Sequence, residues 1–269
     1  MATIGFVGGG NMAEALIKGI IIAKLYRPED IWVSDISGER LELLTKQYNV
    51  RTTAENNELA AKVEIIVLSV KPQNMTEMLR SIKGAVRQDA LVISIAAGKR
   101  IAGICAVLGD VPIVRVMPNT PALIGEGTSA LFANDKAKPM LEKAKTLFSS
   151  VGEIVVLDNE ELMDAVTAVS GSGPAYYFLL TEEMIKAGVE LGLSEEVTKK
   201  LVLQTAKGAA LLAQDAERKG ESAGELRQKV TSPGGTTAAA LKVFTDAKFG
   251  PMVKAAVKKA CEKSQELSK

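Results

Sequence analysis

The chain has 269 residues, enough for one large domain or two modest domains with their own hydrophobic cores. Lys and Arg total 33 against 32 for Asp and Glu, so the chain lacks the excess of positive charge that nucleic-acid grooves and polybasic membrane patches require. It contains no histidine, and its two cysteines, Cys105 and Cys261, stand far apart. We therefore expect no metal site, no Ser-His or Cys-His triad and no nucleic-acid partner.

The expected location follows from the N-terminal sequence and the cysteines. MATIGFVGGG has no basic segment followed by a long apolar run, so it predicts a strand rather than a signal peptide. The apolar run GIIIA after Lys18 is too short to span a bilayer. Two unclustered cysteines are typical of a reduced chain, and we expect a cytoplasmic protein without membrane contact.

Apolar segments alternate with amphipathic segments in the first part of the chain. Strands are predicted at Thr3–Val7, Ile31–Ser34, Ile65–Ser69, Leu91–Ile95, Ile113–Met117, Ser129–Phe132 and Ile154–Leu157. Helices are predicted at Met12–Lys24, Gly38–Tyr48, Gln73–Val86 and Lys136–Ser149. This alternation predicts an α/β domain of the Rossmann type with a mostly parallel sheet, in which the last two strands leave room for an antiparallel edge.

After Leu157 the pattern becomes helical and continues so to the end of the chain. Met184–Leu191 and Val197–Leu212 are rich in Ala and Leu and are apolar on more than one side. Such helices are usually buried in a bundle or in an oligomer interface. We therefore predict two domains, residues 1–158 and an all-α domain of residues 159–269 that self-associates.

A glycine-rich turn follows the first predicted strand. TIGFVGGGNMAEAL contains Gly8-x-Gly10-x-x-Ala13 between a strand and a helix. Gly8 permits the tight turn, Gly10 lets backbone N–H groups approach a pyrophosphate, and Ala13 lets the helix pack closely on the sheet. The alternative is a glycine-rich turn without a ligand. With Asp35 at the end of the second strand, the pattern favours a dinucleotide site.

Asp35 and the residues that flank it favour different dinucleotides. An acidic residue at this position accepts hydrogen bonds from ribose hydroxyls and favours NAD. Ser34, Ser37 and Arg40 flank it and are able to receive a 2′-phosphate. The alternative is that Ser37 caps the next helix and that Arg40 is a solvated helix residue. The residues alone leave the choice of cofactor open.

Three other strand ends carry candidate residues, because ligands in open α/β sheets bind beyond the carboxyl ends of the strands. One end is Ser69-Val70-Lys71-Pro72, where the proline also suits a helix start. At the second, the small residues Ala96, Ala97 and Gly98 leave room for a flat ring or form only a tight turn. At the third, Asn119 lies between two prolines and is a candidate for binding a carboxamide.

The uncharged segment TSPGGTTAAALKVF begins at Thr231, near the other end of the chain. Pro233 directs the backbone, and Gly234 and Gly235 can expose their N–H groups. The helix that starts at Thr236 points its positive end at whatever lies before it. The segment is therefore either a plain helix start or a cradle for a small anion that uses no arginine.

Several of these segments are shared with one family. GFVGGGNMAEAL, SVKPQ, AAG, MPNTPA, DAVTAVSGSGPAY and VTSPGGTTAAAL occur in the order and spacing of the pyrroline-5-carboxylate reductase family, which the chain resembles over essentially its whole length. The resemblance implies a Rossmann domain, a helical domain that interlocks with a partner subunit in a dimer or a dimer-based oligomer, and NAD(P)H as reductant. It implies reduction of the C=N bond of 1-pyrroline-5-carboxylate to L-proline, the last step of proline biosynthesis.

The resemblance also assigns site residues by motif. The cofactor positions carry over to Val7, Gly8, Gly9, Gly10, Asn11, Met12, Ser34, Asn56, Ser69, Val70, Lys71, Pro72, Ala96, Ala97 and Gly98. The substrate positions carry over to Ser232, Gly234, Gly235, Thr236 and Thr237. The family often prefers NADPH, which we expect here with NADH as the alternative. Asp35 departs from what a strict NADPH enzyme would have at its position.

The imine chemistry needs no histidine, because a cyclic imine is basic enough to bind as the iminium. Our hypothesis is that Thr237 is the catalytic residue and hydrogen-bonds the ring nitrogen. Most of the rate then comes from holding donor and acceptor at reacting distance. The alternative proton sources are a bound water and Thr167.

Two other functions compete with this prediction. β-Hydroxyacid dehydrogenases resemble the chain in having a glycine-rich helix start, but they carry a catalytic lysine where this chain has Tyr177. A cofactor-binding sensor without turnover would need the first domain and not SPGGTT. The segment SGSGPAYYF is expected to begin a long helix beside the active site, with Tyr176 and Tyr177 as interface or core residues.

Overall fold

The computed structural model describes residues 3–268. The chain divides into two compact units. The first contains the residues up to Pro174 together with those from Lys259 onward, and the second is Ala175–Lys258.

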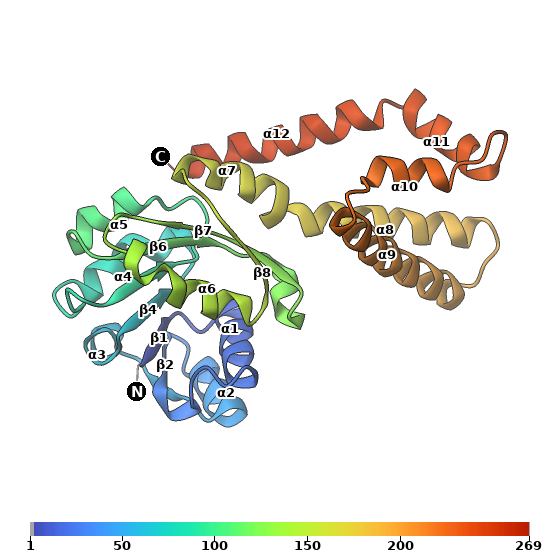
Figure 1. Cartoon of the computed structure of the whole chain (residues 1–269). Helices are drawn as coiled ribbons and strands as arrows, with labels where there is room; N and C mark the ends of the chain where they lie inside the picture. Colours follow the sequence, from blue (N-terminus) through green and yellow to red (C-terminus); the bar gives the residue numbers. More distant parts are fainter. Residues whose placement is uncertain (1–2, 269) are drawn as a thin grey trace. The chain divides into compact units, whose positions relative to one another are not determined.

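A single eight-stranded sheet forms the centre of the first unit, counted within residues 3–268. Its order is β3-β2-β1-β4-β5-β6-β7-β8 (Figure 1). The strands are β1 Ile4–Val7, β2 Ile31–Ser34, β3 Arg51–Thr53, β4 Ile65–Leu68, β5 Leu91–Ser94, β6 Ile113–Met117, β7 Gly127–Ala133 and β8 Gly152–Val156. β1 to β6 are parallel, whereas β7 is antiparallel to β6 and carries β8 parallel to itself. The predicted Rossmann-type sheet with an antiparallel edge is confirmed.

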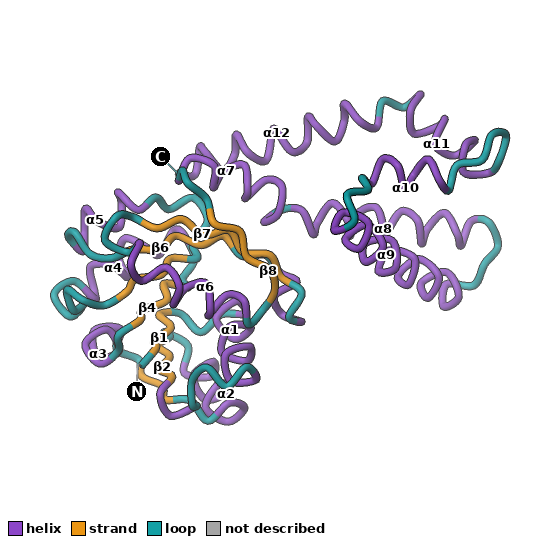
Figure 2. The backbone as a smooth tube through the Cα atoms, in the orientation of Figure 1, coloured by secondary structure: helices purple, strands orange, loops and turns teal. Residues whose placement is uncertain are grey.

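Helices cover both faces of this sheet (Figure 2). Side chains alternate along β1, with Ile4 and Phe6 in one core cluster and Val7 in another. Burial on both faces explains why the strands are apolar throughout. The first cluster includes residues of α1 Asn11–Ile22, α2 Gly38–Tyr48 and α6 Leu141–Ser149. The second includes residues of α3 Asn56–Lys62, α4 Met75–Ile82 and α5 Ile101–Leu108.

The sequence pattern missed β3, α3 and α5 and made two helices too long. β3 has three residues at the sheet edge, too few for a periodic pattern. α4 begins only after a 3₁₀ turn at Pro72–Asn74 and ends at Ile82, shortly before Gly84, whose φ is 86°. α6 likewise follows a 3₁₀ turn at Lys138–Met140.

The second unit consists of helices with little core of their own. They are most of α8 Gly173–Glu190, α9 Glu195–Arg218, α10 Ala223–Lys229, α11 Thr236–Asp246 and the first half of α12 Phe249–Leu267. Its buried residues are Thr198, Val202 and Ala216, all on α9. Large apolar side chains such as Tyr177 and Leu203 stay exposed. None of the helices within residues 3–268 combines the length and the apolar character that a membrane crossing requires.

The two units do not coincide with a division at Asp158. The short helix α7 Met163–Val166 belongs to the first unit, where the side chain of Asp164 is buried. Its Oδ1 accepts hydrogen bonds from the hydroxyls of Ser264 at 2.6 Å and Ser268 at 3.2 Å. The sequence pattern marks where strands stop, whereas compactness also depends on contacts between residues about 100 positions apart.

Candidate functional site

The glycine turn after β1 has a backbone that other residues rarely adopt. Gly8 has a φ of 97°, and its N–H donates to the carbonyl of Ser34 at 2.8 Å. A Cβ atom on Gly8 would lie 2.9 Å from the carbonyl group of Ser69 at the end of β4. Both observations require glycine at this position. The turn lies at β1, between β2 and β4, where the strand order changes direction and ligands of open α/β sheets bind.

The start of α1 fits the pyrophosphate of a dinucleotide. Gly10 is the N-cap, and no side chain accepts a hydrogen bond from the first N–H groups of the helix. A Cβ atom on Gly10 would meet nothing within 4 Å, so the space beside the helix start is open. Uncapped N–H groups at the positive end of a helix are donors for phosphate oxygens. The following residues Asn11 and Met12 form the first turn.

Asp35 lies beside the glycine turn. Its Oδ2 accepts the N–H of Gly9 at 2.7 Å, and its Oδ1 accepts the N–H of Ser37 at 2.9 Å. Through these two hydrogen bonds, the half-buried carboxylate holds the end of β2 and the glycine turn together. Ser34 itself is fully buried with its hydroxyl unpaired, so its carbonyl rather than its side chain supports the turn.

Arg40 is engaged inside the protein. Its guanidinium donates to the carbonyl of Gly9 and pairs with the carboxylate of Glu14. The hydroxyl of Tyr48 donates to the other oxygen of Glu14 at 2.9 Å. Burial acts to raise the pKa of Glu14, but hydrogen bonds from Arg40 and Tyr48 outweigh it and the pKa is lowered. Burial and the bond to Glu14 raise the pKa of Tyr48 to about 12.

The ends of β4 and β5 meet the turn. The Ser69 hydroxyl lies 3.0 Å from the carbonyl oxygen of Val7 and 2.6 Å from that of Gly8. Lys71 is exposed, and Val70 and Pro72 are half-buried. Beyond β5, Ala96 and Gly98 are buried and Ala97 is half-buried. A Cβ on Gly98 would lie 3.1 Å from the carbonyl oxygen of Leu267, so the end of α12 packs against this loop.

The side-chain amides of Asn119 and Asn56 already have partners. Asn119 accepts the N–H of Thr128 at 2.8 Å, and its Nδ2 lies 3.2 Å from the hydroxyl oxygen of Ser170. These bonds join the MPNTPA and SGSG segments, and the predicted contact of Asn119 with a carboxamide stays a prediction. Asn56 donates to Ser81 of α4 at 3.1 Å. Its predicted adenosine contact likewise stays a prediction.

The SPGGTT segment of the second unit forms a tight turn followed by α11. The N–H of Gly235 donates to the carbonyl of Ser232 at 3.0 Å, and Gly234 has a φ of 72°. Proline followed by a glycine of positive φ is typical of a type II turn. Gly235 is the N-cap of α11, no side chain caps the helix, and Thr236 is exposed. The first N–H groups of α11 are therefore free to bind an anion.

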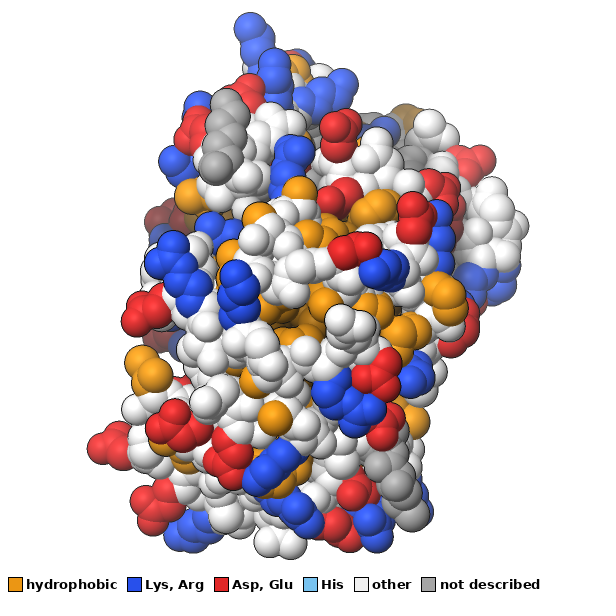
Figure 3. All heavy atoms as spheres, turned by 90° about the vertical axis from the view of Figure 1, so that its left-hand side faces the viewer, with side chains coloured by type: hydrophobic (Ala, Val, Ile, Leu, Met, Phe, Trp, Pro, Cys, Tyr) orange, Lys and Arg blue, Asp and Glu red, His pale blue; other side chains and the backbone are white. Residues whose placement is uncertain are grey.

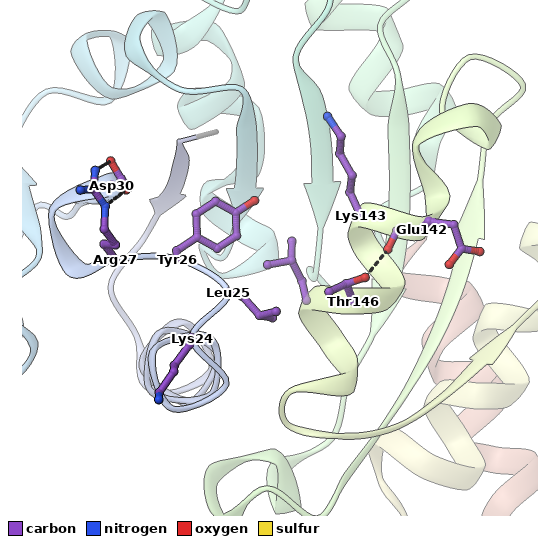
Figure 4. A pocket seen from close by; sticks show the side chains of 9 residues that line it. Lys24, Leu25, Tyr26, Arg27, Asp30, Glu142, Lys143 and Thr146 are labelled. Carbon is purple, nitrogen blue, oxygen red and sulfur yellow. Dashed lines mark hydrogen bonds and ion pairs between the residues drawn. The ribbon is translucent and has the colours of Figure 1, made fainter. Parts of the chain in front are cut away.

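Two cavities lie elsewhere in the first unit. One of about 670 Å³ has Lys24, Leu25, Tyr26 and Arg27 on one side and residues of α6 on the other (Figure 4). The other, of about 830 Å³, is lined by residues of α5, β7 and β8. No predicted site residue lines either cavity.

On the face drawn in Figure 3, positive and negative side chains are interspersed. Within residues 3–268, no group of three acidic, His or Cys side chains is arranged to hold a metal ion.

The sequence pattern did not reveal three contacts within the first unit. They are the ion pair that holds Arg40, the contact of Gly98 with Leu267, and the burial of Asp164 against Ser264. Each joins segments far apart in the chain. No spacing or local composition announces such contacts, because packing creates them.

Family models match both parts of the chain. Residues 160–267 match the model described as pyrroline-5-carboxylate reductase dimerisation. Residues 3–98 match the model described as NADP oxidoreductase, coenzyme F420-dependent.

Relatives and solved structures match over nearly the full length. The pyrroline-5-carboxylate reductase of Synechocystis is 44% identical over 99% of this chain and 98% of its own, and that of Pseudomonas aeruginosa is 43% identical over 98% and 96%. The structure of the reductase from Coxiella burnetii has a TM-score of 0.91 at 37% identity, covering 100% of this chain and 99% of its own. The Plasmodium falciparum enzyme, solved with NADP bound, has a TM-score of 0.89 at 36% identity, covering 100% and 98%. The chain therefore belongs to the pyrroline-5-carboxylate reductase family, because full-length relatives match it and because it has both the glycine turn and the SPGGTT helix start.

Proposed function

We propose that the protein reduces 1-pyrroline-5-carboxylate to L-proline with NAD(P)H, as the last step of proline biosynthesis in the cytoplasm. Residues 1–158 serve as the dinucleotide-binding domain, and residues 159–269 serve as the substrate-binding and oligomerisation domain. The name that the full-length relatives share supports this activity. So does the NADP in the related Plasmodium structure.

The observation that carries the proposal is the uncapped start of α11 after the turn at Ser232–Gly235. The substrate is a small ring with one carboxylate. Free N–H groups at a helix start bind a carboxylate without a charged side chain, and the dipole of the helix adds to that attraction. A cofactor-binding sensor requires no such cradle, whereas a hydroxyacid, which also has a carboxylate, would suit it. Tyr177 in place of the dehydrogenase lysine also disfavours a hydroxyacid substrate.

The reaction places few demands on the protein. When bound, the reduced nicotinamide supplies a hydride to the imine carbon. The ring nitrogen ends protonated, because the substrate binds as the iminium, and the product is L-proline with oxidised cofactor. Residues at the β1, β2, β4 and β5 ends hold the dinucleotide, and Ser232 to Thr237 hold the carboxylate. The rate then comes from orientation and proximity.

Thr237 is the residue we propose to orient the ring nitrogen through its hydroxyl Oγ1. It stands in the first turn of α11 and is half-buried. The rival hydroxyl of Thr167 already donates to the carbonyl of Met163 at 2.8 Å. The Thr167 hydroxyl therefore has a backbone partner in its own helical segment, and Thr167 and a bound water stay the alternatives to Thr237.

We expect Thr237→Ala to lower kcat/KM for pyrroline-5-carboxylate by about tenfold to 100-fold, which corresponds to the loss of one hydrogen bond to a charged group, about 1.5–3 kcal/mol. NADPH oxidation followed by absorbance gives this value, and fluorescence titration should give an unchanged cofactor Kd. Thr245→Ala, on the last turn of the same helix, is the matched control and should keep full activity. Steady-state constants equal to those of the unmodified enzyme would remove Thr237 from the mechanism. L-3-Hydroxy acids with NAD, assayed alongside, should give no turnover.

The helical unit is proposed to complete its core by self-association. The side chains of Tyr177 and Leu191 on or next to α8 are 74% and 86% exposed, and those of Leu203 and Leu211 on α9 are also exposed. Apolar area of this extent on a single unit needs a cover, and the matching family model is described as a dimerisation model. We expect at least a dimer by light scattering at micromolar concentration. A fully active monomer under those conditions would contradict the proposal.

A further inference from the structure

We propose that Asp164 is a positioning residue of this enzyme, which acts through the C-terminal end of α12 to hold the loop of residues 96–98 in place. The inference rests on the proposed function in taking this loop as the part of the dinucleotide site that borders the nicotinamide ring. Asp164, the loop and the end of α12 all belong to the first unit.

The buried carboxylate of Asp164 holds the end of α12 to α7 (Figure 1). Its Oδ1 accepts the hydroxyl of Ser264 at 2.6 Å and that of Ser268 at 3.2 Å. The Asp164 side chain is only 3% exposed, and Ser264 is buried as well. A buried carboxylate that loses its hydrogen-bond donors destabilises the fold, because water does not replace them. These two bonds therefore fix the end of α12 on the first unit.

The same end of α12 supports the loop. Leu267 lies between the two serines in the chain, and a Cβ atom on Gly98 would lie 3.1 Å from the carbonyl oxygen of Leu267. Gly98 also has a φ of 68°, so only glycine suits both the backbone and the close approach. The contact is made with the backbone of α12, which does not yield as a flexible side chain does. A shift of the end of α12 would therefore move or release the loop.

Asp164 and Glu160 hold the other end of the loop. Arg100 follows the loop as the N-cap of α5, and its Nη2 lies 3.9 Å from Oδ2 of Asp164. The N–H of Ile101 donates to the carboxylate of Glu160 at 2.8 Å. The backbone after β5 is thus supported at Gly98 by α12 and at the start of α5 by the two carboxylates. Asp164 takes part in both supports.

This arrangement predicts different effects on the two halves of the cofactor. The adenosine half and the pyrophosphate are proposed to bind at the ends of β1 and β2, whereas the loop follows β5. The nicotinamide ring must lie at reacting distance from the imine carbon, and a misplacement of about 1 Å costs up to about 100-fold in rate. A loosened loop should therefore slow hydride transfer and weaken binding of the whole cofactor, but leave binding of the adenosine half unchanged.

The test is the double variant Ser264→Ala with Ser268→Ala in the full-length protein. Alanine is the best helix former, so α12 itself should persist. Without cofactor, the amide hydrogens of residues 96–101 should exchange with deuterium about tenfold faster than in the unmodified protein. The Kd for NADPH, from fluorescence titration, should rise about threefold to tenfold, whereas the Kd for ADP-ribose 2′-phosphate should stay unchanged. The kcat should fall about tenfold, with the KM for pyrroline-5-carboxylate within about twofold of its original value.

Further variants keep the test decisive. Gln265→Ala changes an exposed residue of α12 between the two serines, and this matched control should alter none of these values. Asp164→Ala should reproduce the loss, whereas Asp164→Asn keeps an oxygen for both hydroxyls and should hold kcat within about threefold of the unmodified enzyme. Ser268→Ala alone removes only the 3.2 Å bond and serves if the double variant fails to fold. In that variant, residues 96–101 should exchange about twofold to threefold faster.

A folded double variant with unchanged exchange in residues 96–101 would overturn the inference. So would an equal loss of affinity for NADPH and for ADP-ribose 2′-phosphate, which would indicate a general loss of structure. The proposed function is tested separately by the unmodified protein. If that protein does not turn over pyrroline-5-carboxylate, while the double variant shows faster exchange and weaker NADPH binding, the proposed function fails and the inference is supported. Normal turnover with unchanged exchange would do the reverse.

Discussion

Gly8→Ala should raise the Kd for either nicotinamide dinucleotide about tenfold to 100-fold and lower the free energy of unfolding by about 1–3 kcal/mol. Gly8 has a φ of 97°, which a residue with a Cβ adopts only at a cost in strain. The new Cβ would lie 2.9 Å from the carbonyl group of Ser69, which belongs to the backbone and moves only with the end of β4. The turn must then shift away from the start of α1. Fluorescence titration and chemical denaturation measure the two effects.

Gly38→Ala is the matched control for Gly8→Ala. Gly38 is the first residue of α2, and Gly8 lies shortly before the start of α1. A Cβ atom on Gly38 would meet nothing within 4 Å. We expect an unchanged cofactor Kd and an unfolding free energy equal to that of the unmodified protein or slightly higher. Equal affinities of Gly8→Ala and Gly38→Ala would show that the turn does not hold the dinucleotide.

Arg115→Met should lower the free energy of unfolding by about 3 kcal/mol, because it leaves a carboxylate without its cation. The Arg115 side chain on β6 is only 3% exposed, and its Nη1 donates to Glu160 at 3.0 Å. The same oxygen of Glu160 accepts the N–H of Ile101 at 2.8 Å, at the start of α5. Methionine keeps most of the volume and removes the charge. Denaturant unfolding measures the change.

A double-mutant cycle distinguishes the lost ion pair from lost packing. Glu160→Gln keeps an oxygen for the N–H of Ile101 and removes the negative charge. If the stranded charge is the cause, Arg115→Met with Glu160→Gln should be more stable than Arg115→Met alone by about 1–2 kcal/mol. Equal stability of the single and double variants would assign the loss to packing around Arg115. Lys145→Met, which removes the ion pair of a half-buried lysine on α6 with the exposed Glu142, should change stability by less than about 0.5 kcal/mol.

Much of the fold was predictable from local pattern. Seven of the strand segments and the glycine turn were predicted, because buried strands are apolar throughout and only glycine suits a turn like that at Gly8. Three short elements, β3, α3 and α5, were missed. β3 has three residues, α3 seven and α5 eight, lengths at which periodicity carries little information.

The candidate site also has features that the sequence predicts and features that only the fold determines. The sequence by itself determined the family, the glycine turn, the acidic residue at the end of β2 and the uncharged start of α11. The tertiary structure alone decided what those residues contact. The sequence allows Arg40 to bind either a phosphate or the carboxylate of Glu14. Packing of the folded chain brings the Glu14 carboxylate to the Arg40 guanidinium. Ser34 and Asp35 are neighbours, yet the strand turns one hydroxyl into the core and leaves the next carboxylate beside Gly9. Local spacing determines backbone geometry, whereas the partners of a side chain depend on segments that only folding brings together.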